Sequence, residues 1–244
     1  MIPDWLHNLS IAYLSFGAAC AVTIAADEVR HPQHMWIMNV VWPVTALFGT
    51  AWVVWQYFTY GRLATHARAH AAMQRGEAMP NKKCTPFPIA VGTGALHCGA
   101  GCTLGDIIAE WLAFAFPGIA VAFAWHGLVG TKMVAVWIFD YILAFGLGIL
   151  FQYYTIAPMR DLSLGQGLVQ AVKADALSLT AWQLGMYGFM ALAYFVIFGS
   201  AIGLKLETDM VEFWFMMQIA MLCGFVTAYP VNWWLIRSGV KERM

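Results

Sequence analysis

Residues 97–111 read HCGAGCTLGDIIAEW and place two thiols, an imidazole and two carboxylates in a segment that is otherwise apolar. Ionisable side chains inside a bilayer cost on the order of a few kcal/mol each, so they mark candidate functional sites. This stretch therefore predicts a membrane-embedded fold and a polar centre within it.

The composition of the whole chain is typical of an integral membrane protein. Of its 244 residues, 61% are hydrophobic and 11% are charged, whereas soluble domains are about 45–50% apolar and about 25% charged. Thirteen basic and thirteen acidic residues give a net charge of zero, which argues against nucleic-acid binding. The five scattered cysteines do not form the pattern of a secreted disulfide framework.

Apolar stretches of about 20 residues predict transmembrane helices. We expect an all-α, polytopic transmembrane bundle that forms a single membrane domain over residues 1–244. The expected spans, about six in number, cover residues 5–26, 35–60, 88–126, 133–157, 174–199 and 211–236. No Lys or Arg precedes the first stretch, so we interpret it as a retained span and not as a signal peptide.

Residues 88–126 are long for one helix and short for two, and the basic residues decide between these alternatives. With one helix, kinked at Pro117, ten of the thirteen Lys and Arg residues share one side, and Arg30, Lys132 and Lys205 lie on the other. This asymmetry satisfies the positive-inside rule, and two helices would violate it. We therefore expect six spans with both termini in the cytoplasm.

Four ionisable residues on the third span repeat at intervals of four, namely Cys98, Cys102, Asp106 and Glu110. In a helix they form one stripe, with neighbouring Cβ atoms about 5–6 Å apart. A disulfide needs about 3.5–4.5 Å, so the two thiols are poorly placed to bond each other but well placed to share Cu(I) or Zn(II). His97 joins that ion only if the neighbouring glycines distort the helix. Otherwise it pairs with a carboxylate or belongs to a second site.

Further ligands must come from other segments. Met217 and Met221 are four apart on the sixth span, and thioethers bind Cu(I), although methionine also fills cores. Three residues at or just before the start of the second span could gather metal at the outer mouth, or could be ordinary loop residues: His31, His34 and Met35. Two acidic residues in or near the membrane could line a proton or ion pathway: Asp140 and Asp175.

Three kinds of function fit these patterns. The first is copper handling, in which the protein stores, delivers or transports the ion, with zinc as an alternative metal. The second is a membrane oxidoreductase that uses the thiols, or a haem bound by His97 or His126. The third is an accessory subunit of a larger membrane complex, or a homo-oligomer, in which the polar stripe only packs or forms structural hydrogen bonds.

Several motifs together resemble a bacterial integral membrane family, known as domain of unknown function 4396. The motif over His97–Trp111 carries most of this resemblance. Further matches are QHMWIMNVVWP at 33–43, FQYYTIAPMR at 151–160, KADALSLT at 173–180 and FWFMMQIAMLCGFVTAYPVNWWLI at 213–236. The resemblance covers almost the whole chain and implies a multi-pass protein of the bacterial cytoplasmic membrane, surrounded by lipid, but it implies no reaction or substrate.

Overall fold

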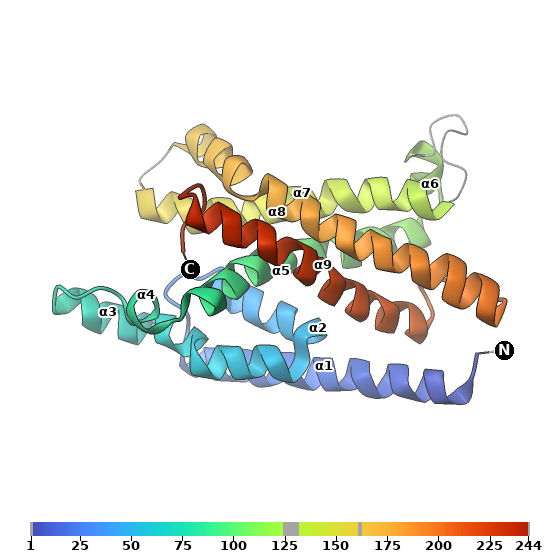
Figure 1. Ribbon diagram of the computed structural model, residues 1–244, viewed down its shortest axis with the longest axis horizontal. Coiled ribbons are helices and arrows are strands. Elements are labelled where there is room, and N and C mark those ends of the chain that lie inside the picture. The colour runs from blue at the N-terminus through green and yellow to red at the C-terminus, as the bar shows by residue number, and fades with distance from the viewer. Residues whose placement is uncertain (1, 124–131, 161–162, 244) are drawn as a thin grey trace.

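The computed structural model describes residues 2–123, 132–160 and 163–243, and every regular element in these ranges is a helix (Figure 1). The longer elements are α1 (Asp4–Arg30), α2 (Met38–Thr59), α5 (Phe87–Ala115), α7 (Lys132–Arg160), α8 (Leu164–Ala191) with its π-helical continuation η3 (Leu192–Ile202), and α9 (Val211–Arg237). The shorter ones are η1 (Gly61–Ala64), α3 (His66–Gln74), α4 (Pro80–Cys84) and α6 (Gly118–Phe123). Among the described residues, six helices are long and apolar enough to cross a membrane, which confirms the predicted fold class.

The third predicted span is one crossing helix, as the charge distribution indicated. α5 ends at Ala115, and Phe116 has φ −126° and ψ 79°, outside the helical region. Pro117 explains this end, because proline disfavours helical geometry in the residue before it. The short helix α6 follows, so the expected kink is a break, and residues 124–131 lie outside the described ranges.

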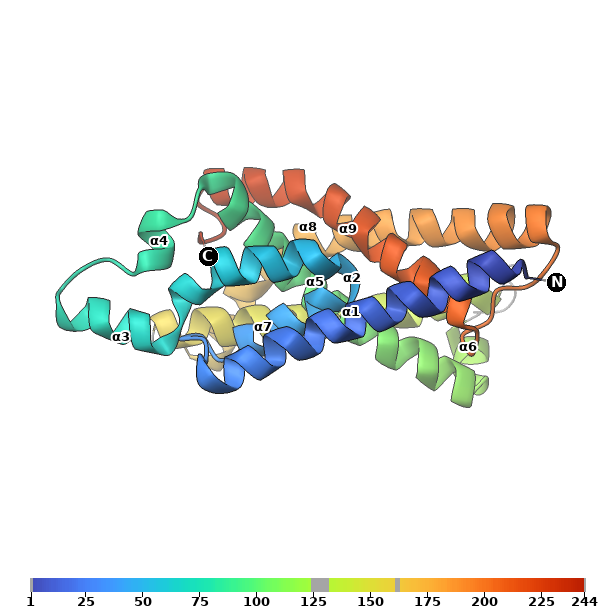
Figure 2. The same ribbon diagram turned by 90° about the horizontal axis from the view of Figure 1, so that it is seen from below.

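The second predicted span is broken in the middle and folds back on itself. Thr50 has φ 44° and ψ −129°, which a continuous helix cannot contain. A straight helix of this length would separate its ends by about 33 Å, yet the flanking residues Gln33 and Thr65 form a β-bridge. The ring centroids of Trp42 and Tyr57 are also only 5.7 Å apart. α2 is therefore a re-entrant hairpin that enters and leaves at the same end of the bundle (Figures 1 and 2).

The break in α2 is supported by its neighbours. Broken helices at membrane depth are tolerated where other groups satisfy the freed backbone atoms. Here Gln218, on α9, donates a hydrogen bond to the carbonyl oxygen of Leu47 at 2.5 Å. Gly17, on α1, faces the same carbonyl so closely that a Cβ atom would lie 2.3 Å from it. Both contacts anchor the tip of the hairpin inside the bundle.

The expectation that both termini share one side is wrong. The N-terminus and the C-terminus lie at opposite ends of the long axis of the bundle (Figures 1 and 2). The physical reason is the hairpin, because hydropathy detects apolar residues but not a reversal of the chain within them. Among the described residues, five of the six long apolar helices thus run along the bundle, and α2 is a re-entrant hairpin.

The corrected path strengthens the charge asymmetry. The C-terminus and both ends of α2 lie at one end of the bundle, which we call the basic end. Arg30 ends α1 there, close to Asp27, whose carboxylate is 3.4 Å from Arg62. With Arg30 added to the ten residues expected on one side, eleven of the thirteen Lys and Arg residues belong to the basic end. Lys132 and Lys205 belong to the other end, called here the opposite end.

Close backbone contacts place α5 at the centre of the bundle. A Cβ atom on Gly101 would lie 2.6 Å from the Cα of Gly148 on α7, and one on Gly105 would lie 2.4 Å from the Cα of Ala144. Small residues let membrane helices approach closely in this way. Of the Gly-Leu-Gly motif at 146–148, only Gly148 makes such a contact, because Gly146 has nothing within 4 Å of a built Cβ.

The topology predicts how cysteine reporters are labelled. In a variant with Cys84→Ser, a membrane-impermeant maleimide should label Asp4→Cys and Lys205→Cys from one side of the membrane, and Ala78→Cys from the other. All three positions are exposed. Labelling of Asp4→Cys and Ala78→Cys from the same side would contradict the re-entrant hairpin.

The α5–α7 contact predicts a matched pair of stability effects. Gly101→Ala should destabilise the protein by about 1–3 kcal/mol, because the new methyl group overpacks the contact with Gly148. Gly146→Ala should be neutral or stabilising, since alanine favours helices and its methyl group meets no neighbour. Thermal unfolding in detergent measures both, and equal effects would show that the close approach is not what constrains Gly101.

Candidate functional site

A lysine from the C-terminal tail occupies the interior of the bundle. After α9 the chain turns at Gly239, which has φ 75°, and returns to the bundle so that Lys241 is only 2% exposed. The Lys241 ammonium donates to Asp175 Oδ1 at 2.5 Å, Asn232 Oδ1 at 2.8 Å, Cys98 Sγ at 2.9 Å and the Gly94 carbonyl at 3.2 Å. We call these four acceptors and the space they enclose the lysine cage.

The cage is built by three helices and held by further hydrogen bonds. Ser178, one turn after Asp175 on α8, donates to Cys98 Sγ at 3.2 Å. Asn232, on α9, donates from Nδ2 to Ser178 Oγ at 2.5 Å, which turns its carbonyl oxygen toward Lys241. The thiol of Cys98 also lies 3.1 Å from Asp175 Oδ1. These bonds orient Asn232 and Cys98 independently of Lys241.

The cage keeps Lys241 charged. Burial by itself lowers the pKa of the lysine, but the Asp175 carboxylate and the Cys98 sulfur outweigh burial and hold the pKa above its ordinary value. A buried charge is stable only when it is paired and hydrogen-bonded. Lys241 therefore supplies the positive charge that balances the acidic and thiol groups at this end of α5.

The other predicted residues of the α5 stripe lie in separate places. His97 is fully buried and turned toward α7, where its Nε2 lies 2.9 Å from Thr155 Oγ1. It therefore does not face Asp175, Ser178 and Asn232 as Cys98 does. Cys102 is fully buried one turn further along α5.

Three carboxyl groups gather further along the stripe. Asp106 accepts a hydrogen bond from Gln183 at 3.1 Å, and Glu110 accepts one from Thr208 at 3.0 Å. Asp140, on α7, is fully buried and interacts electrostatically with both Asp106 and Glu110. Buried carboxylates are costly unless a proton or a cation neutralises them. Glu110 and Thr208 also line a cavity of about 60 Å³ toward the opposite end.

The predicted methionine pair is buried on α9, but only one member has a defined contact with α5. Thr103 Oγ1 lies 3.5 Å from the sulfur of Met221, and Met217 is 4% exposed. Within the described ranges, no group of three or more His, Cys, Asp or Glu side chains is arranged to hold a metal ion. The predicted ligands are thus spread along the bundle and do not form one compact centre.

The residues expected at an outer mouth lie at the basic end, because α2 folds back there. His34 and Met35 line a cavity of about 360 Å³. His31 instead pairs with Asp27 at 3.1 Å. The same cavity is lined by Thr155, the partner of His97, and by Val240 and Glu242, the two neighbours of Lys241. It therefore adjoins the lysine cage.

Sequence reasoning missed Lys241, Asn232 and Ser178 as site residues. Lys241 belongs to a basic tail that reads as an ordinary cytoplasmic end, and it is 143 positions from Cys98. Asn232 carried a usable signal, since an amide inside an apolar span needs a partner. His126, the alternative haem ligand, lies outside the described residues.

The cage predicts strongly coupled stability effects. Lys241→Met should lower the free energy of unfolding by about 3–5 kcal/mol, because it leaves the Asp175 carboxylate buried and uncompensated. Asp175→Asn should do the same by leaving the ammonium unpaired. The double variant should recover at least half of the loss. Lys205→Met, at an exposed position, is the control, and additive losses in the double variant would contradict the pairing.

Comparison with known proteins agrees with this architecture but supplies no activity. Neither the curated proteins nor the solved structures contain a match to the chain. The profile of one protein family, described as a domain of unknown function (DUF4396), matches residues 90–241. That match contains α5 from residue 90 onward, the carboxyl groups and all four acceptors of the cage together with Lys241, and it covers more than half of the chain. The chain therefore belongs to the DUF4396 family.

Proposed function

We propose that this protein transports a soft monovalent metal ion, Cu(I), through the bundle along α5. The observation that carries the proposal is the lysine cage, in which four acceptors from α5, α8 and α9 hold a monovalent cation inside the membrane domain. In this proposal Lys241 occupies the site when the metal is absent, and the metal replaces it.

Charge favours a monovalent cargo. Exchanging the Lys241 ammonium for Cu(I) leaves the net charge of the buried cage unchanged, whereas Zn(II) would add a charge in a region of low dielectric. Lys241 lies on a tail beyond the end of α9, so it can leave the cage without the helices separating. The Cys98 sulfur would then bind the metal as a thiolate and pass its proton to Asp175, whose Oδ1 lies 3.1 Å away, so the net charge of the cage stays the same.

The donor types favour a soft ion. Cys98 and Cys102 follow each other along the buried stripe of α5, and Met221 contacts that helix through Thr103. Thiolates and thioethers are ligands that select Cu(I). Asp106, Glu110 and Asp140 continue the stripe toward the opposite end, where protons on these carboxyl groups could exchange as a cation passes. Asp140 and Asp175 would thus both serve the ion pathway.

The surroundings of His97 disfavour haem binding there. Its Nε2 is taken by Thr155, its ring centroid lies 6.3 Å from that of Phe151, and α5 and α7 approach closely at Gly101. A haem at His97 would have to separate these helices. A haem-dependent oxidoreductase that uses His97 is therefore less well supported than metal transport. In this proposal the protein lies in a bacterial inner membrane with its basic end in the cytoplasm, as the positive-inside rule predicts.

Transport is tested with purified protein in sealed liposomes. With Cu(I) maintained by ascorbate outside and a Cu(I)-specific chelating dye inside, the wild-type protein should give uptake well above protein-free liposomes. Cys98→Ser/Cys102→Ser should reduce the initial rate at least tenfold, because it removes both thiols of the stripe. Cys84→Ser/Cys223→Ser, which changes two cysteines elsewhere, should retain it.

The result that would overturn the proposal is uptake no faster than through protein-free liposomes, for the wild-type protein inserted in either orientation. Retention of full uptake by the Cys98→Ser/Cys102→Ser variant would separately exclude α5 as the path. Asp209→Asn, an exposed acid at the opposite end, is the matched control for Asp175→Asn, which should slow uptake.

A further inference from the structure

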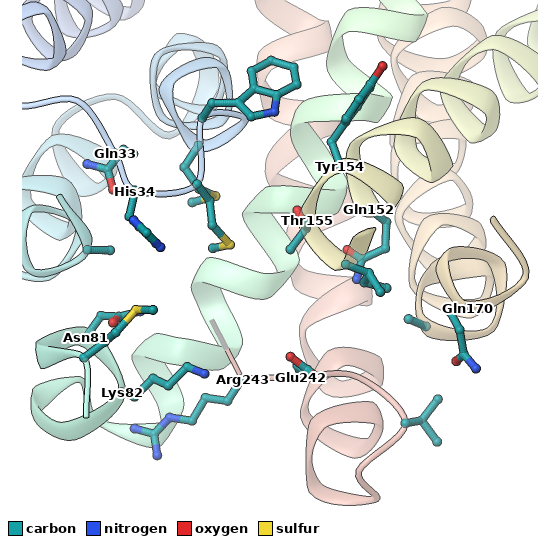
Figure 3. Close-up of a pocket in the computed structure, with 18 residues that line it drawn as sticks. Gln33, His34, Asn81, Lys82, Gln152, Tyr154, Thr155, Gln170, Glu242 and Arg243 are labelled. Atoms are coloured by element: carbon teal, nitrogen blue, oxygen red, sulfur yellow. The ribbon is translucent and has the colours of Figure 1, made fainter. Parts of the chain in front are cut away.

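The 360 Å³ cavity at the basic end is lined by segments that are far apart in the sequence. The loop before α2, the start of α4, the end of α7, α8 and the C-terminal tail all contribute to it (Figure 3). Its volume is within the usual range of ligand sites, about 300–1,000 Å³. The proposed transport path accounts for the cage beside it but not for the cavity itself.

Four soft donors line this cavity: His34, Met35, Met38 and Met79. The imidazole of His34 points into the cavity (Figure 3). Its Nδ1 atom is buried and has no hydrogen-bond partner among the described residues. A buried imidazole nitrogen without a hydrogen bond costs free energy unless a ligand or a water molecule binds to it. Imidazole and thioether groups together form a donor set that suits Cu(I).

Amide side chains also line the cavity, and they too have polar atoms without hydrogen-bond partners. Gln33, Asn81 and Gln152 are at most 8% exposed, and each has a buried oxygen without a hydrogen-bond partner in the described part of the chain. Such groups can bind a ligand's water molecules. Lys82 and Arg243 add positive charge at the lining and Glu242 adds one negative charge. The remaining positive charge disfavours a divalent ion more than a monovalent one.

We propose that His34, Met35, Met38 and Met79 form a second binding site for a soft monovalent metal ion. Its role rests on the proposed transport function, in which it receives or delivers the ion at the basic end. Its position supports this role, because Thr155 joins it to His97, and Ala174, next to Asp175, is part of its wall. The tail that carries Lys241 forms another part of the wall. An ion in the cavity therefore lies next to the segment that must move when Lys241 leaves the cage.

Binding is tested with Ag(I), which has the ligand preferences of Cu(I) without its redox chemistry. In a variant in which all five cysteines are replaced, isothermal titration in detergent should find one Ag(I) per chain. Met38→Leu/Met79→Leu and His34→Gln should each weaken that binding at least tenfold. The controls Met73→Leu and His70→Gln alter exposed positions on α3 and should leave it unchanged. Leucine conserves volume, so the methionine variants should fold.

A second measurement keeps the native cysteines. With ¹³C-methyl-labelled methionine, Ag(I) should shift the methyl signals of Met35, Met38 and Met79 and leave that of Met73 in place. Unmoved signals at saturating Ag(I), or equal binding by the cavity variants and their cysteine-free parent, would overturn the second site. If the wild-type protein transports Cu(I) but binds no Ag(I) in this cavity, the second site is refuted and the proposed transport function is not. If the protein binds Ag(I) in the cavity but does not transport Cu(I), only the proposed transport function is refuted.

Discussion

The buried charge of Lys241 is the constraint on which the interior of this protein depends. An ammonium ion is stable inside the bundle only because Asp175, Cys98, Asn232 and Gly94 all direct acceptors at it. These contacts join α5, α8 and α9 and hold the C-terminal tail against the bundle. Cys98, the first thiol of the α5 stripe, thus accepts a hydrogen bond from a cation of the same chain, Lys241.

The glycines of α5 make this arrangement possible. Gly101 and Gly105 let α7 approach so closely that neither position has room for a side chain, and the same approach brings Asp140 toward Asp106 and Glu110. Close packing and polar chemistry are therefore consequences of the same stretch of sequence. They divide the interior into a cationic region near the basic end and an acidic region further along the same helix.

The re-entrant hairpin gives the basic end its cavity. Because α2 returns to the end it entered from, His34 and Met35 lie beside the end of α7 and the C-terminal tail. A crossing helix would have placed them at the other end, far from Lys241. Broken helices that point into the membrane are common around substrate sites of transporters. In this protein the hairpin brings soft donors next to a cage that already holds a cation, which is the arrangement expected where an ion is handed from one site to the next.

The sequence by itself determined the all-α membrane fold, the six apolar helices and the polar stripe within residues 97–111, because apolar length and the spacing of polar residues are local properties. Charge counting also predicted correctly that α5 is one helix. Only the tertiary structure decided that α2 folds back, since a reversal at Thr50 leaves the hydropathy of the segment unchanged. It also decided that Cys98 faces a lysine 143 residues away, while His97 and Glu110 face other partners. Contacts between distant segments depend on how the helices pack, and no spacing within one helix encodes them.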